Sequence, residues 1–205
     1  AGLITTAVCA YGDNPLSGTP GTYRRARGSD SAYGLFGAPP AYAMIARRHM
    51  IEYGTTSLQL GAMAVATRTW ATRNPNAHRR EPMTIEDHQG SRYVAWPLHL
   101  LDCCLVSDGG AAVVVTSAGR AAHLKKAPVY VMGIGQHHIA WDLPERPTLT
   151  TSGAKVSGET AFQMAGITPD DVDICELYDC FTIVPIITLE DYGFCAKGEG
   201  GAFVE

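Results

Sequence analysis

The sequence predicts an α/β fold in which short buried strands alternate with capped helices. Apolar runs of strand length are bounded by Gly, Pro and Asn turn signals. Apolar residues at helical spacing recur between those runs, and a chain of 205 residues is long enough to bury a core. Alternation of strands and helices along a chain is typical of layered α/β architectures.

Four apolar runs have the length and composition of buried strands. Each is short, rich in Val, Ile or Ala, and adjoins a turn signal, as strands inside a layered protein do. The predicted strands are residues 3–10, 111–115, 129–135 and 172–176. The second of these follows Ser107-Asp108-Gly109-Gly110, which predicts a tight turn entering the strand.

Helix signals lie between the predicted strands. Pro40 opens the first helix, Gly54 stops it, and Gly166 stops a later one. Residues 84–87 are predicted to form a capped turn. Residues 15–40 are rich in Gly, Pro and Ser and are expected to form a long irregular loop, a kind of segment that often carries function. The predicted helices are residues 40–53, 55–73, 118–125, 158–165 and 182–192.

Charge and hydropathy exclude several functional classes. The formal net charge is −4 and no basic stripe is dense enough to indicate nucleic-acid binding. The longest apolar runs, residues 111–116 and 183–189, are too short to span a bilayer. The first residues predict a strand and not a signal peptide, because they lack a charged n-region followed by a long apolar segment. The last residues, GEGGAFVE, are expected to form neither a helix nor a strand. Since the chain also starts inside a predicted strand, we expect both ends to be cut from a longer protein.

The cysteines predict reduced thiols and a cytoplasmic location. No CxxC pair stands at zinc spacing from a second one, and most of the cysteines lie in apolar surroundings, as buried reduced thiols do. Free thiols persist in reducing compartments, so no disulfide scaffold is expected. No metal is expected either, because the neighbouring His137 and His138 point apart on an extended chain. The six cysteines are Cys9, Cys103, Cys104, Cys175, Cys180 and Cys195.

The strongest candidate for chemistry is the segment Cys175-Glu176-Leu177-Tyr178-Asp179-Cys180-Phe181, called the site loop below. It lies where a predicted strand ends and a helix begins, the place where open α/β sheets usually carry functional groups. A Tyr at position 178 can donate a hydrogen bond to an enolate, or act as a base if its pKa, normally about 10, is lowered. The structural alternative is a packed Tyr178 with its hydroxyl on a backbone carbonyl. Asp179 is expected to cap the following helix, with orientation of a loop as the alternative, and Cys180 is a candidate nucleophile beside Tyr178 and Asp179.

The site loop and the residues before it, SGAKVSGETAFQMAGITPDDVDI, resemble the start of the C-terminal half of a thiolase. Sterol-carrier-protein thiolases read His-Asp-Cys-Phe where this chain has Tyr178-Asp179-Cys180-Phe181, and this resemblance implies that Cys180 is a small buried filler and not a nucleophile. Residues 101–112 resemble the N-D-G-A-A-A segment that closes the first thiolase half. RRHMIEYGTTSLQLGAMAVATRTWATRNPNA, followed by EPMTIEDH, resembles the loop domain of lipid-transfer-protein thiolases. The sequence therefore resembles the lipid-transfer-protein and sterol-carrier-protein branch of the thiolase superfamily over nearly the whole chain.

The resemblance implies the layered αβαβα thiolase fold with mixed sheets, present in part and with an inserted loop domain. Residues 1–126 would be the end of the N-terminal thiolase half, including a loop domain at about 15–100, and residues 127–205 the start of the C-terminal half. In this family the nucleophilic Cys precedes the first strand seen here, and the Gly-His-Pro loop follows the last residue. We therefore expect an internal fragment that is inactive by itself.

For function, the resemblance implies cleavage of a carbon–carbon bond next to an acyl-CoA carbonyl. Tyr178 occupies the family position that faces the reacting thioester, and Tyr in place of Asn or His resembles the steroid side-chain aldolases. Retro-aldol cleavage of a β-hydroxyacyl-CoA, with Tyr178 as catalytic residue, is the prediction. The alternatives are an acetyl-CoA acyltransferase acting on 3-ketoacyl-CoA, and a non-catalytic thiolase-like lipid-transfer subunit.

The expected ligand is a coenzyme A thioester that binds as substrate and not as a covalently attached cofactor. Arg24, Arg25 and Arg27 cluster in the long loop and are candidates for its phosphates, with a solvated basic loop as the alternative. The family also implies a homodimer and a small zinc-ribbon/OB-fold partner subunit. No nucleic-acid partner is expected.

Overall fold

The computed structural model of the chain describes residues 4–18, 29–140 and 145–205. It divides into two compact units, which are described separately. The first combines residues 1–23 with 105–132, and the second combines residues 24–104 with 133–205. The site loop therefore belongs to the second unit.

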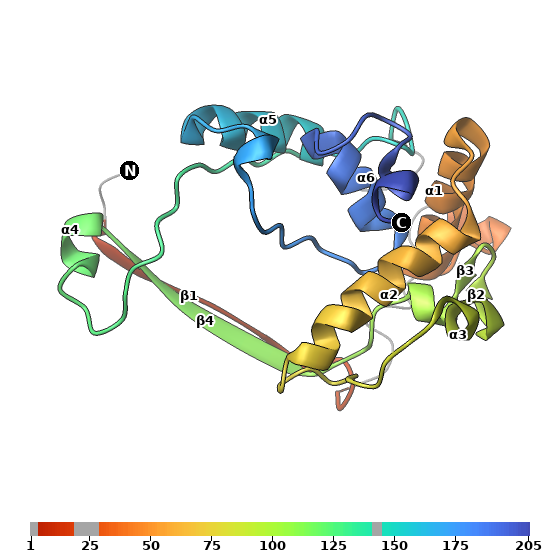
Figure 1. Ribbon diagram of the computed structural model, residues 1–205, viewed down its shortest axis with the longest axis horizontal. Helices are drawn as coiled ribbons and strands as arrows, with labels where there is room; N and C mark the ends of the chain where they lie inside the picture. The colour runs from red at the N-terminus through yellow and green to blue at the C-terminus, as the bar shows by residue number, and fades with distance from the viewer. Residues whose placement is uncertain (1–3, 19–28, 141–144) are drawn as a thin grey trace. The chain divides into compact units, whose positions relative to one another are not determined.

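The first unit is built on a two-stranded antiparallel ribbon (Figure 1). Strand β1 (Thr6–Asp13) pairs with β4 (Gly109–Thr116) in an unbroken register, and the short helix α4 (Ala118–Ala121) follows. The tight turn predicted at residues 107–110 is absent, because residues 104–108 run without a turn and Gly109 and Gly110 already belong to β4. The approach to β4 is held instead by the Asp108 carboxylate. This group accepts hydrogen bonds from the backbone N–H groups of Leu16 at 2.7 Å and Ser17 at 3.2 Å.

Both strands of this ribbon were predicted and are confirmed, but they are not buried as the sequence suggested. Val8 is 69% exposed and Val114 is 61% exposed. An apolar run shows which segment suits a buried sheet, whereas burial requires a second layer. No such layer covers the ribbon within the described part of this unit.

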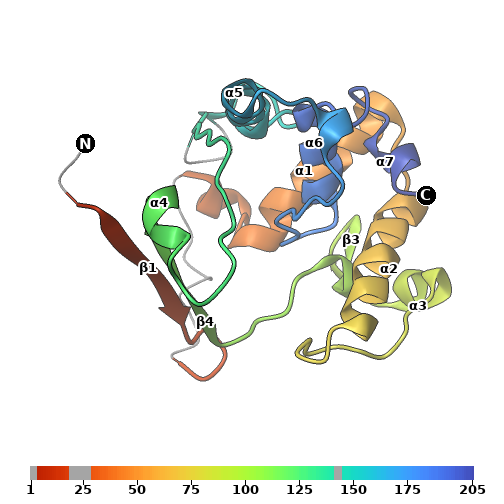
Figure 2. The same cartoon turned by 60° about the vertical axis from the view of Figure 1, so that its left-hand side comes forward.

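The second unit is mainly helical and carries one small hairpin (Figures 1 and 2). Its short connections include three 3₁₀ turns. In chain order the elements are η2 (Ser29–Tyr33), α1 (Ala38–Tyr53), α2 (Ser57–Arg73), α3 (Ile85–Gly90), β2 (Tyr93–Ala95), β3 (Leu98–His99), η3 (Leu100–Asp102), α5 (Ala154–Ala165), η5 (Pro169–Asp171), α6 (Ile183–Tyr192) and α7 (Gly200–Phe203). Among the residues described, every helix falls short of the length and apolarity needed to cross a bilayer.

Local signals account for most of these helix ends. Gly54 ends α1 in the left-handed conformation at φ 77°, which a residue without Cβ adopts at little cost. A capping box of Thr56 and Gln59 starts α2, and Thr84 with Asp87 starts α3. The predicted stop at Gly54 and the predicted capped turn at residues 84–87 are confirmed.

Helix α5 begins four residues before the predicted start, and the reason is the role of Gly158. This glycine lies inside the helix, where a Cβ atom would come within 2.4 Å of the Tyr192 ring. The glycine therefore permits α5 to lie close to α6. It does not mark a helix terminus.

The core of the second unit joins α1, α2 and α6 to the end of the site loop. Figure 2 shows α6 beside α1, and the two helices are in contact. Burial of this apolar surface is the main favourable contribution to folding. The buried cluster consists of Ala43, Ile45, Ala46, Leu60, Leu98, Cys180, Phe181, Ile183, Ile186 and Ile187.

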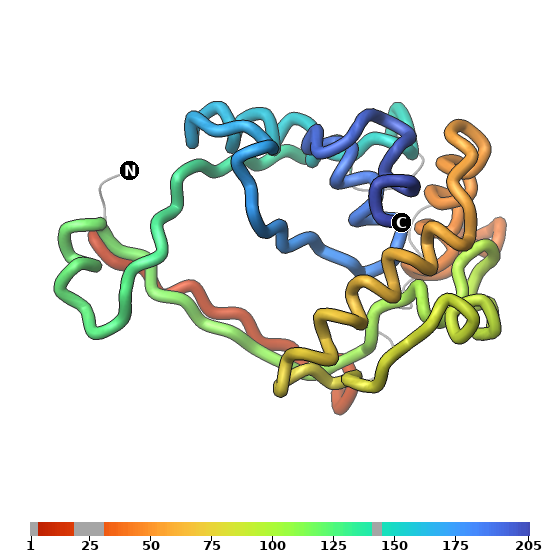
Figure 3. Tube along the Cα trace, viewed as in Figure 1, coloured from red at the N-terminus to blue at the C-terminus, as the bar shows by residue number. Residues whose placement is uncertain are grey.

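Two predicted strands and one chain end differ from expectation. Residues 129–135 and 172–176 run as extended coil (Figure 3), and Ile174 is 81% exposed. A strand needs a neighbour to satisfy its backbone hydrogen bonds, and no described strand pairs with either segment. The final residues, expected to lack a helix, form α7, where the Gly200 N–H donates to Glu190 Oε1 at 2.9 Å.

Candidate functional site

The site loop is irregular up to residue 179 and is then held firmly at its C-terminal end. Phe181 forms an antiparallel bridge with Cys103. Beside that bridge, the Cys104 N–H donates to the Cys180 carbonyl at 3.0 Å. The loop therefore enters α6 from a fixed anchor.

Tyr178, the predicted catalytic residue, presents its ring to solvent just before this anchor. The side chain is 77% exposed, and its hydroxyl hydrogen-bonds the Cys180 sulfur. It also lies close enough to Tyr42 of α1 to interact with it electrostatically. An exposed phenol on an anchored loop can reach a substrate, and the catalytic role of Tyr178 stays a prediction.

Tyr42 supports the site loop from α1. Its ring stacks on Phe181 with the centroids 4.5 Å apart. Burial raises the pKa of Tyr42 above its usual value, and interaction with Cys180 raises that pKa further. Tyr42 therefore remains a protonated hydrogen-bond donor at neutral pH.

The thiols near Tyr178 are poor nucleophiles. Burial raises the pKa of Cys180, and hydrogen bonds from Tyr42 and Tyr178 offset only part of that rise. Burial, with the nearby Asp102 carboxylate, raises the pKa of Cys103 to about 11. Because the thiolate is the reactive form, these groups are largely inert at neutral pH.

Because its thiol stays protonated, Cys180 is interpreted as a packing residue and not as a nucleophile. This interpretation can be tested by substitution. Loss of a catalytic nucleophile costs on the order of 10⁶-fold in kcat. We expect Cys180→Ala to retain kcat within about tenfold, equivalent to roughly 1.4 kcal/mol of barrier. Iodoacetamide labelling at pH 7, followed by mass spectrometry, should modify the exposed Cys9 well before Cys180. Rapid labelling of Cys180 with loss of activity would contradict the assignment.

The prediction that Asp179 caps α6 is wrong. The helix begins at Ile183, with Thr182 as the N-cap residue and no side-chain cap hydrogen bond. Asp179 is three residues before that N-cap position, outside the place from which a cap side chain reaches the first helical N–H groups. The Thr182 hydroxyl donates instead to the Asp102 carboxylate at 2.5 Å.

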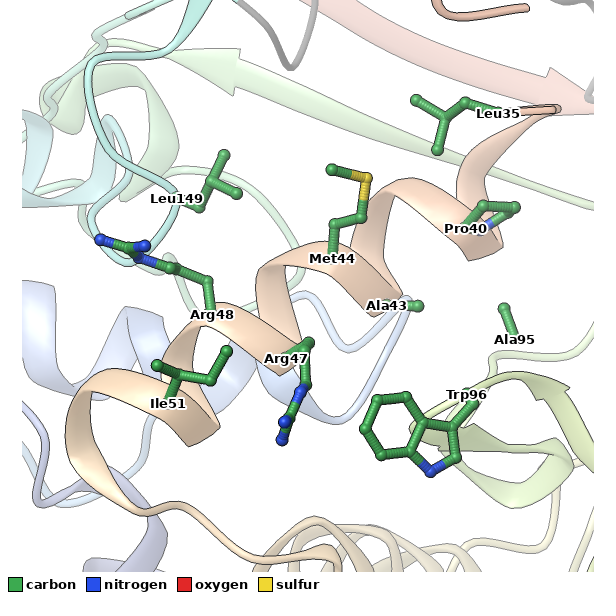
Figure 4. Close-up of a pocket in the computed structure, with 10 residues that line it drawn as sticks. All are labelled: Leu35, Pro40, Ala43, Met44, Arg47, Arg48, Ile51, Ala95, Trp96 and Leu149. Carbon is green, nitrogen blue, oxygen red and sulfur yellow. The ribbon is translucent and has the colours of Figure 1, made fainter. Parts of the chain in front are cut away.

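A pocket of about 440 Å³ lies along α1 (Figure 4). The Arg47 guanidinium carbon is 4.8 Å from the Trp96 ring centroid, a cation–π geometry. Arg48 pairs with Glu52 at 2.5 Å, whereas no described carboxylate pairs with Arg47. Apolar walls with one such cation suit an amphipathic anion. The lining residues are Leu35, Pro40, Ala43, Met44, Arg47, Arg48, Ile51, Ala95, Trp96 and Leu149.

The arginines singled out from the sequence, Arg24, Arg25 and Arg27, lie outside the described residues. Their proposed contact with coenzyme A phosphates therefore stays a prediction. Across the part of the chain that the structure describes, no three His, Cys, Asp or Glu side chains gather in an arrangement that could hold a metal ion.

Comparison with known proteins identifies the family. Residues 135–205, which include the site loop, match the family described as Thiolase C-terminal domain-like. The chain is 37% identical over 221 residues to the steroid side-chain-cleaving aldolase of Thermomonospora curvata, covering 99% of this chain and 56% of that protein. The chain belongs to the thiolase superfamily. Its predicted α/β thiolase fold and its resemblance to the lipid-transfer-protein branch are thereby confirmed.

This thiolase-superfamily chain is also similar to two further proteins, one named an acetyltransferase and one named an aldolase. It is 44% identical over 168 residues to the acetyl-CoA acetyltransferase of Methanothermobacter thermautotrophicus, covering 82% of this chain and 44% of that one. The solved structure of the Ltp2-ChsH2(DUF35) aldolase superimposes with a TM-score of 0.85 at 38% identity, covering 98% of this chain and 55% of that one. The chain thus spans about half the length of the relatives it matches.

Sequence reasoning missed the residues that support the site loop of this thiolase chain. Tyr42 carried no signal beyond its place in the first turn of a helix. Asp102 did carry one, because it is the single charge in the apolar run Leu100–Val106. A buried charge requires partners, so such a residue predicts a polar network.

Proposed function

We propose that the full-length protein cleaves a carbon–carbon bond of an acyl-CoA thioester, by retro-aldol reaction of a β-hydroxyacyl-CoA in lipid or steroid catabolism. The observation that carries this proposal is the exposed Tyr178 phenol on an anchored loop, next to thiols that stay neutral. Similarity to a protein named steroid side-chain-cleaving aldolase along nearly the whole chain supports it.

In the proposed step, Tyr178 takes part in proton transfer to or from the substrate oxygen. The β-hydroxyl loses its proton and its oxygen becomes a carbonyl as the Cα–Cβ bond breaks. The electron pair of that bond moves into the thioester as an enolate, which is then protonated at Cα. Because a hydroxyl is a weaker acid than a phenol, Tyr178 acts in its ionised form or through a relay.

The reaction assay separates the two chemistries that the superfamily supports. We expect the full-length protein to convert a β-hydroxyacyl-CoA to a ketone or aldehyde and a shorter acyl-CoA, without added coenzyme A. Product analysis by liquid chromatography and mass spectrometry measures both fragments. Turnover only of a 3-ketoacyl-CoA, and only with free coenzyme A, would contradict the proposal and select thiolysis.

Thiolysis is the second candidate function. The observation that favours it is the 44% identity to an acetyl-CoA acetyltransferase. It requires a reactive thiolate, and the thiols of Cys103, Cys104 and Cys180 do not supply one because burial raises their pKa values. In the full-length protein this candidate therefore depends on a cysteine outside these positions.

We further propose that the protein is a cytoplasmic homodimer that pairs with a small zinc-ribbon/OB-fold subunit and binds coenzyme A thioesters non-covalently. The name of the Ltp2-ChsH2(DUF35) aldolase supports a partner subunit. Free thiols at all six cysteines are consistent with a reducing compartment. Arg24, Arg25 and Arg27 remain our proposed contacts to the coenzyme A phosphates.

A further inference from the structure

The site loop is tied to a buried polar network that the proposed chemistry does not use directly. At its centre, the Asp102 carboxylate is 2% exposed and accepts three hydrogen bonds. The donors are His88 Nε2 at 2.8 Å, the Thr182 hydroxyl at 2.5 Å and the His99 backbone N–H at 2.6 Å. A buried carboxylate with this many donors is held in one orientation.

The network continues from His88 to the start of α2. His88 Nδ1 accepts from Gln89 Nε2 at 3.1 Å, which leaves Nε2 as the nitrogen that donates to the carboxylate. The second N–H of Gln89 Nε2 donates to the Ser57 carbonyl at 3.0 Å. Gly61 makes room for the imidazole, because a Cβ there would lie 2.9 Å from His88 Nδ1. The carboxylate is therefore braced by α2 and α3.

Two hydrogen bonds connect Asp102 to Thr182 and thereby hold the end of the site loop in place. Besides the hydroxyl contact, the Thr182 N–H donates to the Asp102 backbone carbonyl at 3.0 Å. Thr182 directly follows Phe181 and Cys180, the two anchored residues of the loop. Tyr178 lies only four residues before Thr182. A shift of this anchor therefore moves the phenol.

We propose that Asp102 is a positioning residue that fixes the site loop, and with it the Tyr178 hydroxyl, by holding Thr182. This inference rests on the proposed function of Tyr178. Misplacement of a catalytic group by about 1 Å can cost about 10²-fold. We therefore expect Asp102→Asn in the full-length protein to lower kcat by about 10- to 10²-fold with little change in KM.

The matched control is a second buried His–carboxylate pair in the same unit. His49 Nε2 lies 3.1 Å from Glu190 Oε2, and both side chains are fully buried. Their other polar partners are Thr55, Gly200 and Lys197, which lie outside the site loop. Glu190→Gln should destabilise the protein while leaving kcat of the folded enzyme unchanged. Equal kcat losses in Asp102→Asn and Glu190→Gln would show that both report general stability and would overturn the positioning role.

Two further measurements keep the inference testable if Asp102→Asn folds poorly. Thr182→Val removes the hydroxyl donor and keeps the side-chain shape, so kcat should fall in this variant. Thr182→Ser keeps the donor, so this variant should retain kcat. Adding Asp102→Asn or Thr182→Val to Tyr178→Phe should lower kcat no further, because both act through the same hydroxyl. Full additivity, or equal activity of the Val and Ser variants, would overturn the inference.

The outcomes also separate this inference from the proposed function. Wild-type kcat in Tyr178→Phe would overturn the catalytic role of Tyr178. Wild-type kcat in Asp102→Asn and Thr182→Val, with Tyr178→Phe impaired, would overturn only the positioning role of Asp102.

Discussion

Replacing Tyr178 with Phe should lower kcat of the full-length protein by about 10²–10⁴-fold, the usual contribution of a general acid–base group. The substitution removes one hydroxyl and keeps the ring. Because the side chain is 77% exposed, packing of the core should not change. Steady-state kinetics with a β-hydroxyacyl-CoA measures the effect, and thermal unfolding checks the fold.

The control for this variant is Tyr42→Phe, which removes the neighbouring hydroxyl and retains the stacking on Phe181. If only the Tyr178 phenol moves the proton, Tyr42→Phe should lose far less activity. If Tyr178 is merely a surface residue, its Phe variant should turn over at nearly the wild-type rate. It should then lose at most the roughly 1 kcal/mol of stability that one hydrogen bond contributes. That result would remove Tyr178 from the chemistry.

The helices of this chain could be predicted from sequence because their signals are local. Gly54 ends α1 and Thr56 starts α2, each through contacts within a few residues. The segments 129–135 and 172–176 were wrongly predicted as strands because a strand also needs a partner, and the partner is not encoded in the segment. Burial of β1 and β4 failed as a prediction for a related reason, since it depends on a second layer.

The same distinction between local and distant contacts applies to the site. Tyr178 stands out in sequence because it lies in a family signature at a predicted loop–helix boundary. Its supports cannot be paired with each other from sequence, because Asp102 and Thr182 are 80 residues apart and meet only in the folded chain. Tyr42 reaches Phe181 from still farther along the sequence. A motif therefore names the reactive group, whereas only the structure shows what holds it in place.

The largest expected effect on stability comes from Glu190, which links three helices of the second unit. Its carboxylate bonds His49 of α1 at 3.1 Å, the Gly200 N–H of α7 at 2.9 Å and Lys197 at 3.1 Å. Removing one partner of a buried charge pair typically costs about 3–5 kcal/mol, because the groups that remain lose the partner that compensated their burial. We expect Glu190→Gln to lower the free energy of unfolding at pH 7 by about that much, measured by urea denaturation.

The pH dependence of this effect has a defined direction. Burial alone would raise the pKa of Glu190, but hydrogen bonding and charge interaction with His49, with the other donors, lower it from 4.5 to about 2. Because the folded-state pKa is depressed, the stabilisation is fully present above pH 4.5 and is lost as the pH falls toward 2. The stability difference between wild type and Glu190→Gln should therefore shrink across that window. The partly exposed Glu52, paired with Arg48, is the control, and Glu52→Gln should destabilise the protein at pH 7 far less than Glu190→Gln does. A Glu190→Gln protein as stable as Glu52→Gln, or a difference that does not change between pH 4.5 and pH 2, would show that Glu190 does not hold these helices together.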